Sequence, residues 1–557
     1  MNEPSRVASN ADASSTVASS TATASTATAS TADAVEHLDV LIIGAGLSGI
    51  GAAHHLQTDS PWASYAVLEA RDSIGGTWDL FRYPGNRSDS DMFTLGFPFR
   101  PWRGENAIAA GGDILQYIKD TAAEAGIDRK IRFGHRVLSA DYSSADARWT
   151  VVAERMDSSA EVADGSPAPV TEAASPAAPP ALVTFTCDFV FSCSGYYRYD
   201  HGYLPEFKGT DSYKGQIIHP QFWPTDLDYS GKSVIVIGSG ATAMTLVPSM
   251  APQASHVTML QRSPTYVLAL PAKNPAANMI RKVLPEKMSG PIVRWMLALG
   301  TLTLYQVSQR RPKAVKKMIR KQLESVLPPG YDIDTHFTPK YDPWDQRLCV
   351  VPDGDLFTAI SDGTVEVVTD KIAEFTPKGI RLESGAELEA DIIVTATGLE
   401  MLFIGGIELS LDGEAVDPSE HLTYKGMMLE GVPNFAVAFG YTNASWTLKA
   451  DLTSEYVCRL LNHMRESGWD TCTAVNTESQ PESLPLLGLT SGYVQRAAGR
   501  FPKQGTKFPW QVHQNYLRDY RAMKMRPVVD DAMRFSKAQD DDGRVVVRDL
   551  AGSAIRN

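Results

Sequence analysis

The distribution of apolar residues predicts two strand–turn–helix units in different parts of the chain. Asp39–Ile43 and Ser233–Ile237 are short, almost uninterrupted apolar runs, which are typical of strands buried on both faces of a parallel sheet. The first run is followed at once by GAGLSG at Gly44–Gly49, and the second by GSGATA at Gly238–Ala243. A helical pattern follows each glycine cluster. The sequence therefore predicts an α/β fold.

Both glycine clusters have the spacing of a turn that binds a dinucleotide. Such a turn needs glycine because it is tight, because its backbone must approach a pyrophosphate, and because the next helix must pack closely on the strand. The residues at these positions are Gly44, Gly46 and Gly49 in the first unit and Gly238, Gly240 and Ala243 in the second. Two such turns indicate two Rossmann-like domains, an arrangement that suits an enzyme passing a hydride from one dinucleotide to the other.

The residue after the second strand differs between the two units. Tyr65–Leu68 ends at Glu69, where a carboxylate would bind ribose hydroxyls and repel a 2′-phosphate. His256–Leu260 leads instead to Arg262, whose planar guanidinium suits a phosphate dianion. We therefore expect FAD or NAD in the first unit and NADPH in the second.

Composition and charge exclude several classes of protein. The chain has 557 residues, enough for more than one domain, and its net charge of −13 argues against a nucleic-acid surface. Five cysteines form no disulfide framework and no metal-ligand set, so we expect a reducing, cytoplasmic location and no metal. No uncharged apolar run reaches the roughly 18 residues that a membrane-spanning helix needs.

One stretch leaves two interpretations open. From about Pro271 to Gly330, helical patterns replace the alternation of strands and helices, and the strongly apolar run Trp295–Val307 is followed closely by lysines and arginines. An interfacial helix with a basic flank would give a peripheral membrane contact and suit a lipid-like substrate. A core helix followed by a solvated basic helix is the more common arrangement.

Two segments are too poor in apolar residues to fold. One is the Ser/Thr/Ala-rich start of the chain, and the other is the Ala/Pro/Ser/Glu segment between the strand-like runs at Trp149–Glu154 and Val183–Cys187. The predicted organisation is a disordered tail at 1–36, the first part of an FAD domain at 37–190 with a disordered insertion at 156–181, the first part of an NADPH domain at 191–270, a helical insertion at 271–344, the second part of the NADPH domain at 345–390, and the second part of the FAD domain with the C-terminal region at 391–557.

Two longer motifs lie near the glycine turns. YKGQIIHPQFWP at Tyr213–Pro224 reads aromatic-x-Gly-x-x-x-His-x-x-x-Trp-Pro, and GGTWDLFRYPGNRSD at Gly75–Asp89 has Gly, Gly, Trp, Tyr-Pro-Gly and Asp at fixed intervals. Both resemble signatures of type I Baeyer–Villiger monooxygenases, which are class B flavoprotein monooxygenases of the flavin-containing monooxygenase superfamily. Tyr213 stands where that family usually has Phe. An Ala-Thr-Gly ending at Gly398 also resembles a superfamily motif.

The resemblance implies an activity and a set of site residues. It implies FAD and NADPH as cofactors and insertion of one oxygen atom from O₂ into a ketone through a flavin C4a-peroxide. The residues that it places along the flavin are Gly76, Thr77, Trp78 and Asp89, with Gly398 where the chain returns to the FAD domain. Arg347 would point at the flavin as the catalytic cation, held by Asp89. Gly215, His219 and Trp223 would couple the two domains, and His219 would not act as a base.

Several activities fit the same two-dinucleotide plan. S- or N-oxygenation and hydroxylation of long alkanes are alternatives within the superfamily, although Trp223–Pro224 favours the Baeyer–Villiger branch. A disulfide reductase would need a redox-active cysteine pair near Gly75, and the sequence has none there. A non-catalytic, NADPH-responsive flavoprotein is the alternative from another class. The expected partners are O₂ and a small ketone or sulfide, and neither the natural substrate nor the oligomeric state follows from the sequence.

Overall fold

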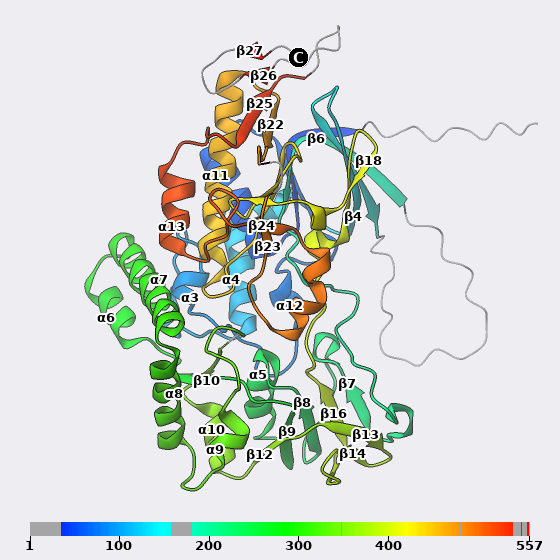
Figure 1. Cartoon of the computed structure of the whole chain (residues 1–557), viewed down its shortest axis with the longest axis vertical. Helices are drawn as coiled ribbons and strands as arrows, with labels where there is room; N and C mark the ends of the chain where they lie inside the picture. The colour runs from blue at the N-terminus through cyan, green and yellow to red at the C-terminus, as the bar shows by residue number, and fades with distance from the viewer. Residues whose placement is uncertain are drawn as a thin grey trace, which may run out of the picture. The chain divides into compact units, whose positions relative to one another are not determined.

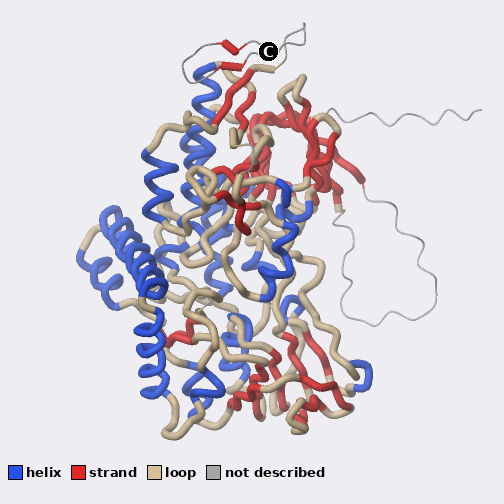
Figure 2. Tube along the Cα trace, in the orientation of Figure 1, coloured by secondary structure: helices blue, strands red, loops and turns tan. Residues whose placement is uncertain are grey.

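The structure is a computed structural model of the whole chain, and it describes residues 35–156, 181–346, 348–478 and 481–538, with the backbone of two short strands at 547–548 and 554–555. The predicted tail and the predicted insertion at 156–181 lie almost entirely outside the described residues. Figure 2 shows the strands gathered in two main groups with helices beside each. These groups contain the two large sheets on which the glycine turns lie.

The larger sheet carries the first glycine turn. Among the described residues it has nine strands, which in spatial order are β18 (Glu414–Val416), β17 (Glu408–Leu411), β4 (His135–Ser143), β5 (Arg148–Arg155), β6 (Ala181–Ser192), β1 (Glu36–Ile43), β2 (Tyr65–Leu68) and β3 (Ile131–Arg132), with β21 (Phe435–Val437) also paired with β6. β6, β1, β2 and β3 run parallel, so their carboxyl ends meet at one edge. The turn after β1 lies at that edge.

The strand β6 differs from the prediction. The predicted strand-like run ends at Cys187, and a separate apolar run follows at Phe189–Phe191, whereas the structure has one continuous strand of 12 residues. β6 pairs with β1 along most of its length, while its other edge changes partner from β5 to β21 near Asp188. The change of partner explains the break in the apolar pattern, because different neighbours cover the two halves.

The second sheet carries the second glycine turn. It consists of the parallel strands β12 (Val365–Thr369), β9 (His256–Gln261), β8 (Ser233–Ile237), β16 (Ile392–Thr395) and β7 (Gln216–Ile218). The predicted strands at Ser233–Ile237 and His256–Leu260 are therefore confirmed to within one residue. With both sheets present, the chain has the predicted α/β fold with two Rossmann-like units.

The other strands form smaller sheets. They are β10 (Val267–Leu270) with β11 (Cys349–Pro352); β13 (Ile372–Thr376), β14 (Gly379–Leu382) and β15 (Glu387–Glu389); β19 (Thr423–Tyr424) with β20 (Met428–Leu429); β22 (Thr471–Ala474), β25 (Met533–Ser536), β26 (Val547–Arg548) and β27 (Ala554–Ile555); and β23 (Ser483–Pro485) with β24 (Lys503–Gly505).

The helices are labelled in Figure 1 where there is room. They are α1 (Leu47–Asp59), α2 (Thr77–Leu80), α3 (Met92–Leu95), α4 (Gly111–Glu124), α5 (Ala241–Met250), α6 (Pro275–Val283), α7 (Glu286–Arg310), α8 (Pro312–Val326), α9 (Ile333–Phe337), α10 (Asp355–Ser361), α11 (Trp446–Ser467), α12 (Gly492–Ala497) and α13 (Tyr516–Tyr520). None of the helices in the described part of the chain is long and apolar enough to cross a membrane.

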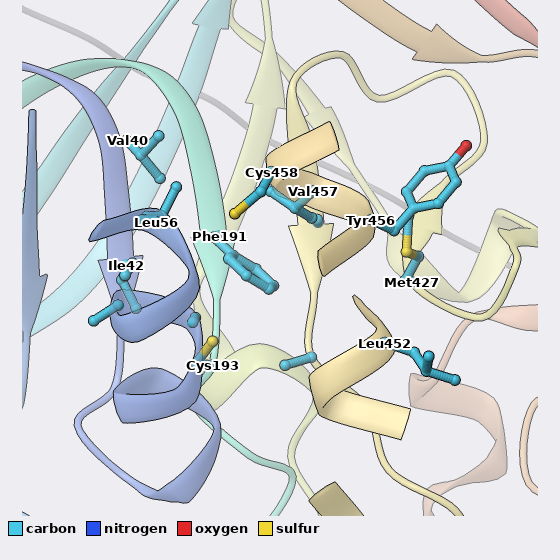
Figure 3. Packing of buried hydrophobic residues seen from close by; sticks show 14 of the residues in the cluster. Val40, Ile42, Leu56, Phe191, Cys193, Met427, Leu452, Tyr456, Val457 and Cys458 are labelled. Atoms are coloured by element: carbon cyan, nitrogen blue, oxygen red, sulfur yellow. The ribbon is translucent and has the colours of Figure 1, made fainter. Parts of the chain in front are cut away.

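α1 and α11 bury one face of the larger sheet. Figure 3 shows Val40 and Ile42 of β1, Phe191 of β6, Leu56 of α1 and Val457 of α11 in one apolar cluster, all of them buried. Burial of such side chains contributes about 1.5–3 kcal/mol each. The helix that follows the first glycine turn is therefore held between the sheet and α11.

A buried histidine also ties α1 to α11. The imidazole of His55 is hydrogen-bonded through Nδ1 to Asp59 at 2.8 Å and through Nε2 to Asp451 of α11 at 2.9 Å. Burial alone would lower the pKa of His55, but the hydrogen bonds to the two carboxylates outweigh it and raise the pKa to about 9. His55 is therefore a cation at neutral pH.

Candidate functional site

In the first glycine turn two glycines have no room for a side chain, whereas the third, Gly46, would accept a Cβ at ordinary contact distance. Gly44 has φ +103°, and a Cβ added there would lie 2.7 Å from the carbonyl oxygen of Cys193. A Cβ on Gly49 would lie 1.8 Å from the carbonyl oxygen of Gly44, because α1 packs directly on the turn. At Gly46 the nearest atom would be Cα of Gly76 at 3.6 Å, an ordinary contact. The space beside Gly46 is the position at which a pyrophosphate can approach the backbone.

The second turn repeats this division. Gly238 has φ +142°, and a Cβ there would lie 2.3 Å from the carbonyl oxygen of Ala396, whereas a Cβ on Gly240 would meet nothing within 4 Å. Ala243 takes the third position and is fully buried, so this turn accepts a methyl group where the first needs glycine. α1 begins after Gly46 and α5 after Gly240, and neither has a side-chain cap. Their first N–H groups can therefore bind phosphate oxygens, so both turns fit a dinucleotide.

Glu69 lies buried at the end of β2 and contacts the first turn. Its two carboxylate oxygens accept hydrogen bonds from the backbone N–H of Ala45, at 2.7 Å, and of Arg71, at 3.0 Å. Burial raises the pKa of Glu69, and these two hydrogen bonds partly oppose the shift. The carboxylate thus fixes the turn itself, and a role toward ribose hydroxyls stays a prediction.

Arg262 occupies the corresponding position in the second unit. Its side chain is exposed, and it forms no ion pair with any residue that the structure describes. An exposed guanidinium without a carboxylate partner keeps all five donors available to a phosphate. Glu69 is thus buried and bound by the protein itself, whereas Arg262 is exposed and available to a ligand.

One end of the Gly75–Asp89 loop contacts the first turn. A Cβ on Gly76 would lie 3.1 Å from Cα of Gly46, so the two backbones touch. The predicted residues Thr77 and Trp78 begin α2, the short helix that follows Gly76. Asp79 anchors this helix by accepting hydrogen bonds from Arg71 and from two neighbours, Ser73 and Arg82, each at 2.6 Å. These contacts outweigh burial and hold the pKa of Asp79 below its usual value.

The other end of this loop contacts the second unit. A Cβ on Gly85 would lie 1.9 Å from Oγ of Ser249 and 2.6 Å from the carbonyl oxygen of Thr245, both on α5. Arg87 forms a partly buried ion pair with Asp355 of α10 and donates to the carbonyl oxygen of Met244. The loop therefore extends from the first glycine turn to the helix that follows the second.

The structure describes only one of the two predicted catalytic residues. Asp89 is an exposed residue at the end of the loop. Arg347 lies outside the described residues, so its role stays a prediction. The turn just before it is strained, because Trp344 has φ +76°, which is unusual for a bulky residue. Strain of this kind clusters at functional sites.

The Tyr213–Pro224 motif packs on the second unit. The hydroxyl of Tyr213 donates to the carbonyl oxygen of Ala390 at 2.9 Å, and a Cβ on Gly215 would lie 2.3 Å from that hydroxyl. Trp223 is half-buried against the apolar cluster of the same unit. These contacts explain the aromatic residue and the glycine of the motif by packing.

His219 links this motif to the segment after β6. Its Nδ1 accepts a hydrogen bond from the backbone N–H of Gln221 at 3.2 Å, and its ring lies 2.0 Å from where a Cβ on Gly202 would be. Burial lowers the pKa of His219, and a backbone contact with Gly398 partly opposes the shift. A neutral, half-buried ring between two chain segments agrees with a positioning role, which stays a prediction. Gly398 itself has φ +111°, and its carbonyl oxygen accepts from the N–H of Tyr203.

A buried polar network lies behind the loop that precedes α11. The hydroxyl of Tyr441 donates to Oδ2 of Asp519 at 2.7 Å, and Nζ of Lys449 lies 3.1 Å from the same oxygen. All three side chains are buried. Burial next to a carboxylate raises the pKa of Tyr441 well above its usual value. The network fixes the loop from Gly440 to Ser445, whose last residue is the N-cap of α11.

Comparison with known proteins identifies the family. Residues 183–411 match a model described as flavin-binding monooxygenase-like, and residues 42–103 match an NAD(P)-binding Rossmann-like domain. The chain is 53% identical over 503 residues to the FAD-containing monooxygenase EthA of Mycobacterium tuberculosis, covering 90% of this chain and 98% of EthA. It is 46% identical to the probable FAD-binding monooxygenase AlmA of Acinetobacter baylyi, covering 91% and 97%. The chain belongs to the flavin-binding monooxygenase family.

Solved structures agree on the fold of this monooxygenase. An open structure of cyclohexanone monooxygenase matches with a TM-score of 0.64 at 18% identity, covering 90% of this chain and all of that one. An oxidised steroid monooxygenase bound to NADP matches with a TM-score of 0.63 at 22% identity, covering 79% and 88%. OTEMO in complex with FAD and NADP matches with a TM-score of 0.60 at 23% identity, also covering 79% of this chain and 88% of that one. The predicted FAD and NADPH are of the same kinds as the cofactors named for these proteins.

Some site residues of this monooxygenase carry no signal in the sequence. The structure brings together Gly46, Gly76 and Glu69 at one turn. It also places Tyr199 there, with its hydroxyl 3.5 Å from where a Cβ on Gly76 would be. Tyr199 is about 120 residues from Gly76 in the chain, and no local pattern marks it. The pair of Arg87 and Asp355 is hidden in the same way.

Proposed function

We propose that this monooxygenase inserts one oxygen atom of O₂ into apolar ketones and yields esters or lactones. The observation that supports this proposal is the Gly75–Asp89 loop, which touches the first glycine turn with Gly76 and α5 of the second unit with Gly85. This double contact supports a single site that spans both turns. When bound, FAD supplies oxygen activation and NADPH supplies the hydride.

Different residues of the chain bind different parts of the two cofactors. N–H groups at the start of α1 and α5 bind the two pyrophosphates, and the absence of a side chain at Gly46 and Gly240 lets the phosphates approach the backbone. Arg262 binds the 2′-phosphate that distinguishes NADPH from NADH. Glu69 holds the first turn in the conformation that the cofactor needs.

Arg347 and Asp89 are proposed to act at the reacting atoms. A guanidinium is always charged, so Arg347 stabilises negative charge that develops on oxygen during addition to a carbonyl, and Asp89 orients it. Removing one such contact typically costs about 3–4 kcal/mol, or two to three orders of magnitude in rate. Arg347→Ala should therefore lose ester formation while NADPH still reduces the flavin. Ester formation at the wild-type rate in this variant would exclude the role.

The decisive experiment uses FAD-loaded protein with NADPH, ¹⁸O₂, a medium-chain methyl ketone and an aryl methyl sulfide. Mass spectrometry should find one labelled oxygen in the ester. The Gly46→Ala variant, which should fold without binding FAD, is the matched control and should give no product. Sulfoxide without ester would indicate an S-oxygenase instead, and flavin that NADPH fails to bleach would indicate a non-catalytic flavoprotein.

A further inference from the structure

α6 and α7 leave large apolar side chains in contact with solvent. The exposed fractions reach 67% for Met279 and 74% for Val283 on α6. These two residues lie four apart and therefore share one side of the helix. The exposed apolar residues of the two helices, which we call the α6–α7 face, are Met279, Val283, Met288, Ile292, Leu299 and Val307. These residues follow one another on two consecutive helices, whereas exposed apolar residues of an ordinary surface are scattered singly.

α7 is held by one side only, which leaves the exposed side free. Val293 and Ala298 are buried, and the ring of Trp295 packs on Tyr516 and Tyr520 with centroids 5.1 and 5.0 Å apart. The exposed residues of α7 are spaced by four, seven and eight positions, which places them on one stripe. Figure 1 shows α6 and α7 as a green pair at the left margin of the ribbon.

The same stretch is strongly basic within an acidic protein. Between positions 273 and 321 there are twelve lysines and arginines and a single acid, Glu286, whereas the whole chain has a net charge of −13. Three of the twelve, Lys273, Lys316 and Arg320, form ion pairs, and Arg281 and Arg294 donate to backbone carbonyl oxygens. The other seven form neither an ion pair nor a side-chain hydrogen bond with any residue in the described ranges: Lys282, Lys287, Arg310, Arg311, Lys313, Lys317 and Lys321. Apolar side chains with free cations beside them suit an interface between hydrocarbon and anionic headgroups.

We propose that the α6–α7 face docks on an anionic lipid surface. A second copy of the chain fits less well, because a twofold contact would bring the same seven cations against each other. Lipid headgroups supply the opposite charge, and the acyl region takes up the apolar side chains without needing a shaped partner.

The side of α7 opposite the face packs on the rest of the protein. On its inner side α7 places Ala298 against Tyr441 and Leu448, next to the loop that precedes α11. A cavity of about 240 Å³ lies between α6, α7 and the segment around Trp102, with Phe93 and Val293 in its lining. An enzyme docked in this way would meet apolar substrates where they are concentrated.

Vesicle sedimentation tests the proposal with FAD-loaded, full-length protein. The protein should pellet with equimolar phosphatidylcholine–phosphatidylglycerol vesicles, much less with pure phosphatidylcholine, and less at high ionic strength. Met279→Gln/Val283→Gln should weaken binding at least about tenfold, because each exposed side chain loses its burial in lipid. Lys313→Gln/Lys317→Gln/Lys321→Gln should weaken binding to the anionic vesicles by about fivefold per lysine.

The matched control is Leu204→Gln/Leu484→Gln, which removes exposed leucines elsewhere and should bind as the wild type does. The proposal is wrong if wild-type protein stays in the supernatant, if both vesicle types bind it equally, or if the control variant loses as much binding as Met279→Gln/Val283→Gln. The proposal is also wrong if the wild type is an oligomer in analytical ultracentrifugation, Met279→Gln/Val283→Gln is a monomer, and both bind vesicles equally. The α6–α7 face would then join two copies of the chain.

Discussion

Replacing Asp519 by alanine should destabilise the protein far more than an ordinary surface mutation. Lys449 Nζ lies 3.1 Å from Asp519 Oδ2, and the side chains are 4% and 8% exposed. Without Asp519, Lys449 keeps the carbonyl oxygen of Lys425 at 3.0 Å but has no carboxylate to balance its charge. Tyr441 also loses the acceptor of its hydroxyl.

The magnitude follows from these contacts. Breaking a buried ion pair from one side typically costs about 3–5 kcal/mol, because an uncompensated charge stays buried. A buried hydroxyl without a partner costs about 1–3 kcal/mol more, although the two effects act on the same site and will not add fully. We therefore expect Asp519→Ala to lower the free energy of unfolding by at least about 3 kcal/mol. Replacing both charges, with Lys449→Met/Asp519→Leu, should recover most of this loss.

Urea unfolding followed by tryptophan fluorescence measures the effect on FAD-loaded protein. The matched control is Glu455→Gln, which breaks the more exposed pair of Lys524 and Glu455, 2.7 Å apart, and should cost about 1 kcal/mol or less. A loss in Asp519→Ala no larger than in the control would refute the reasoning, because Lys449 would then shed its proton or reach water at little cost.

Three further predictions concern pH and cofactor binding. The pKa of His55 is raised to about 9 from an ordinary 6.5, so protonated His55 stabilises the folded state by about 3 kcal/mol. This contribution to the free energy of unfolding is fully present below pH 6.5 and is lost as the pH rises through 9. Urea unfolding at a series of pH values should show this fall in the wild type and not in His55→Gln. An equal dependence of the free energy of unfolding on pH in the two proteins would contradict the prediction. Gly240→Ala should fold normally but bind NADP⁺ at least about tenfold more weakly by calorimetry, since its methyl group fills the space for the pyrophosphate. Gly238→Ala should instead lower the melting temperature, and unchanged affinity in Gly240→Ala would exclude this turn as the site. Arg262→Gln should weaken NADPH binding by about 1.5–3 kcal/mol and leave NADH unaffected, because a hydrogen bond to a charged group is lost. Equal losses for both nucleotides would place the 2′-phosphate elsewhere.

The sequence predicts those parts of the site that depend on neighbouring residues. Strand, glycine turn and helix follow one another within about 15 residues, so local chemistry fixes Gly46 and Gly240 without knowledge of the fold. Glu69 could be placed because a parallel strand pair brings it to the same edge as the turn. Its hydrogen bond to Ala45 could not, because it depends on the rotamer of a buried side chain.

Contacts between residues that meet only through tertiary packing could not be predicted from the sequence. Lys449 and Asp519 are 70 positions apart, and both types are normally exposed. The apolar run in α7 was ambiguous for a related reason, since periodicity cannot say which neighbours cover a helix. Tyr516 and Tyr520 bury one side of it and leave the other exposed. Which of the two interpretations holds depends on what covers the exposed side.

The contacts of the Gly75–Asp89 loop give a physical reason for two of its fixed glycines. Gly76 must be small because its backbone touches Gly46, and Gly85 must be small because it rests on α5. Arg87 adds an ion pair of low exposure, which is worth more than a surface pair and fixes the direction of the loop. A shift of α5 on nucleotide binding would therefore move the loop at the first turn as well. Packing contacts of the motif thus connect the first glycine turn to the helix that follows the second.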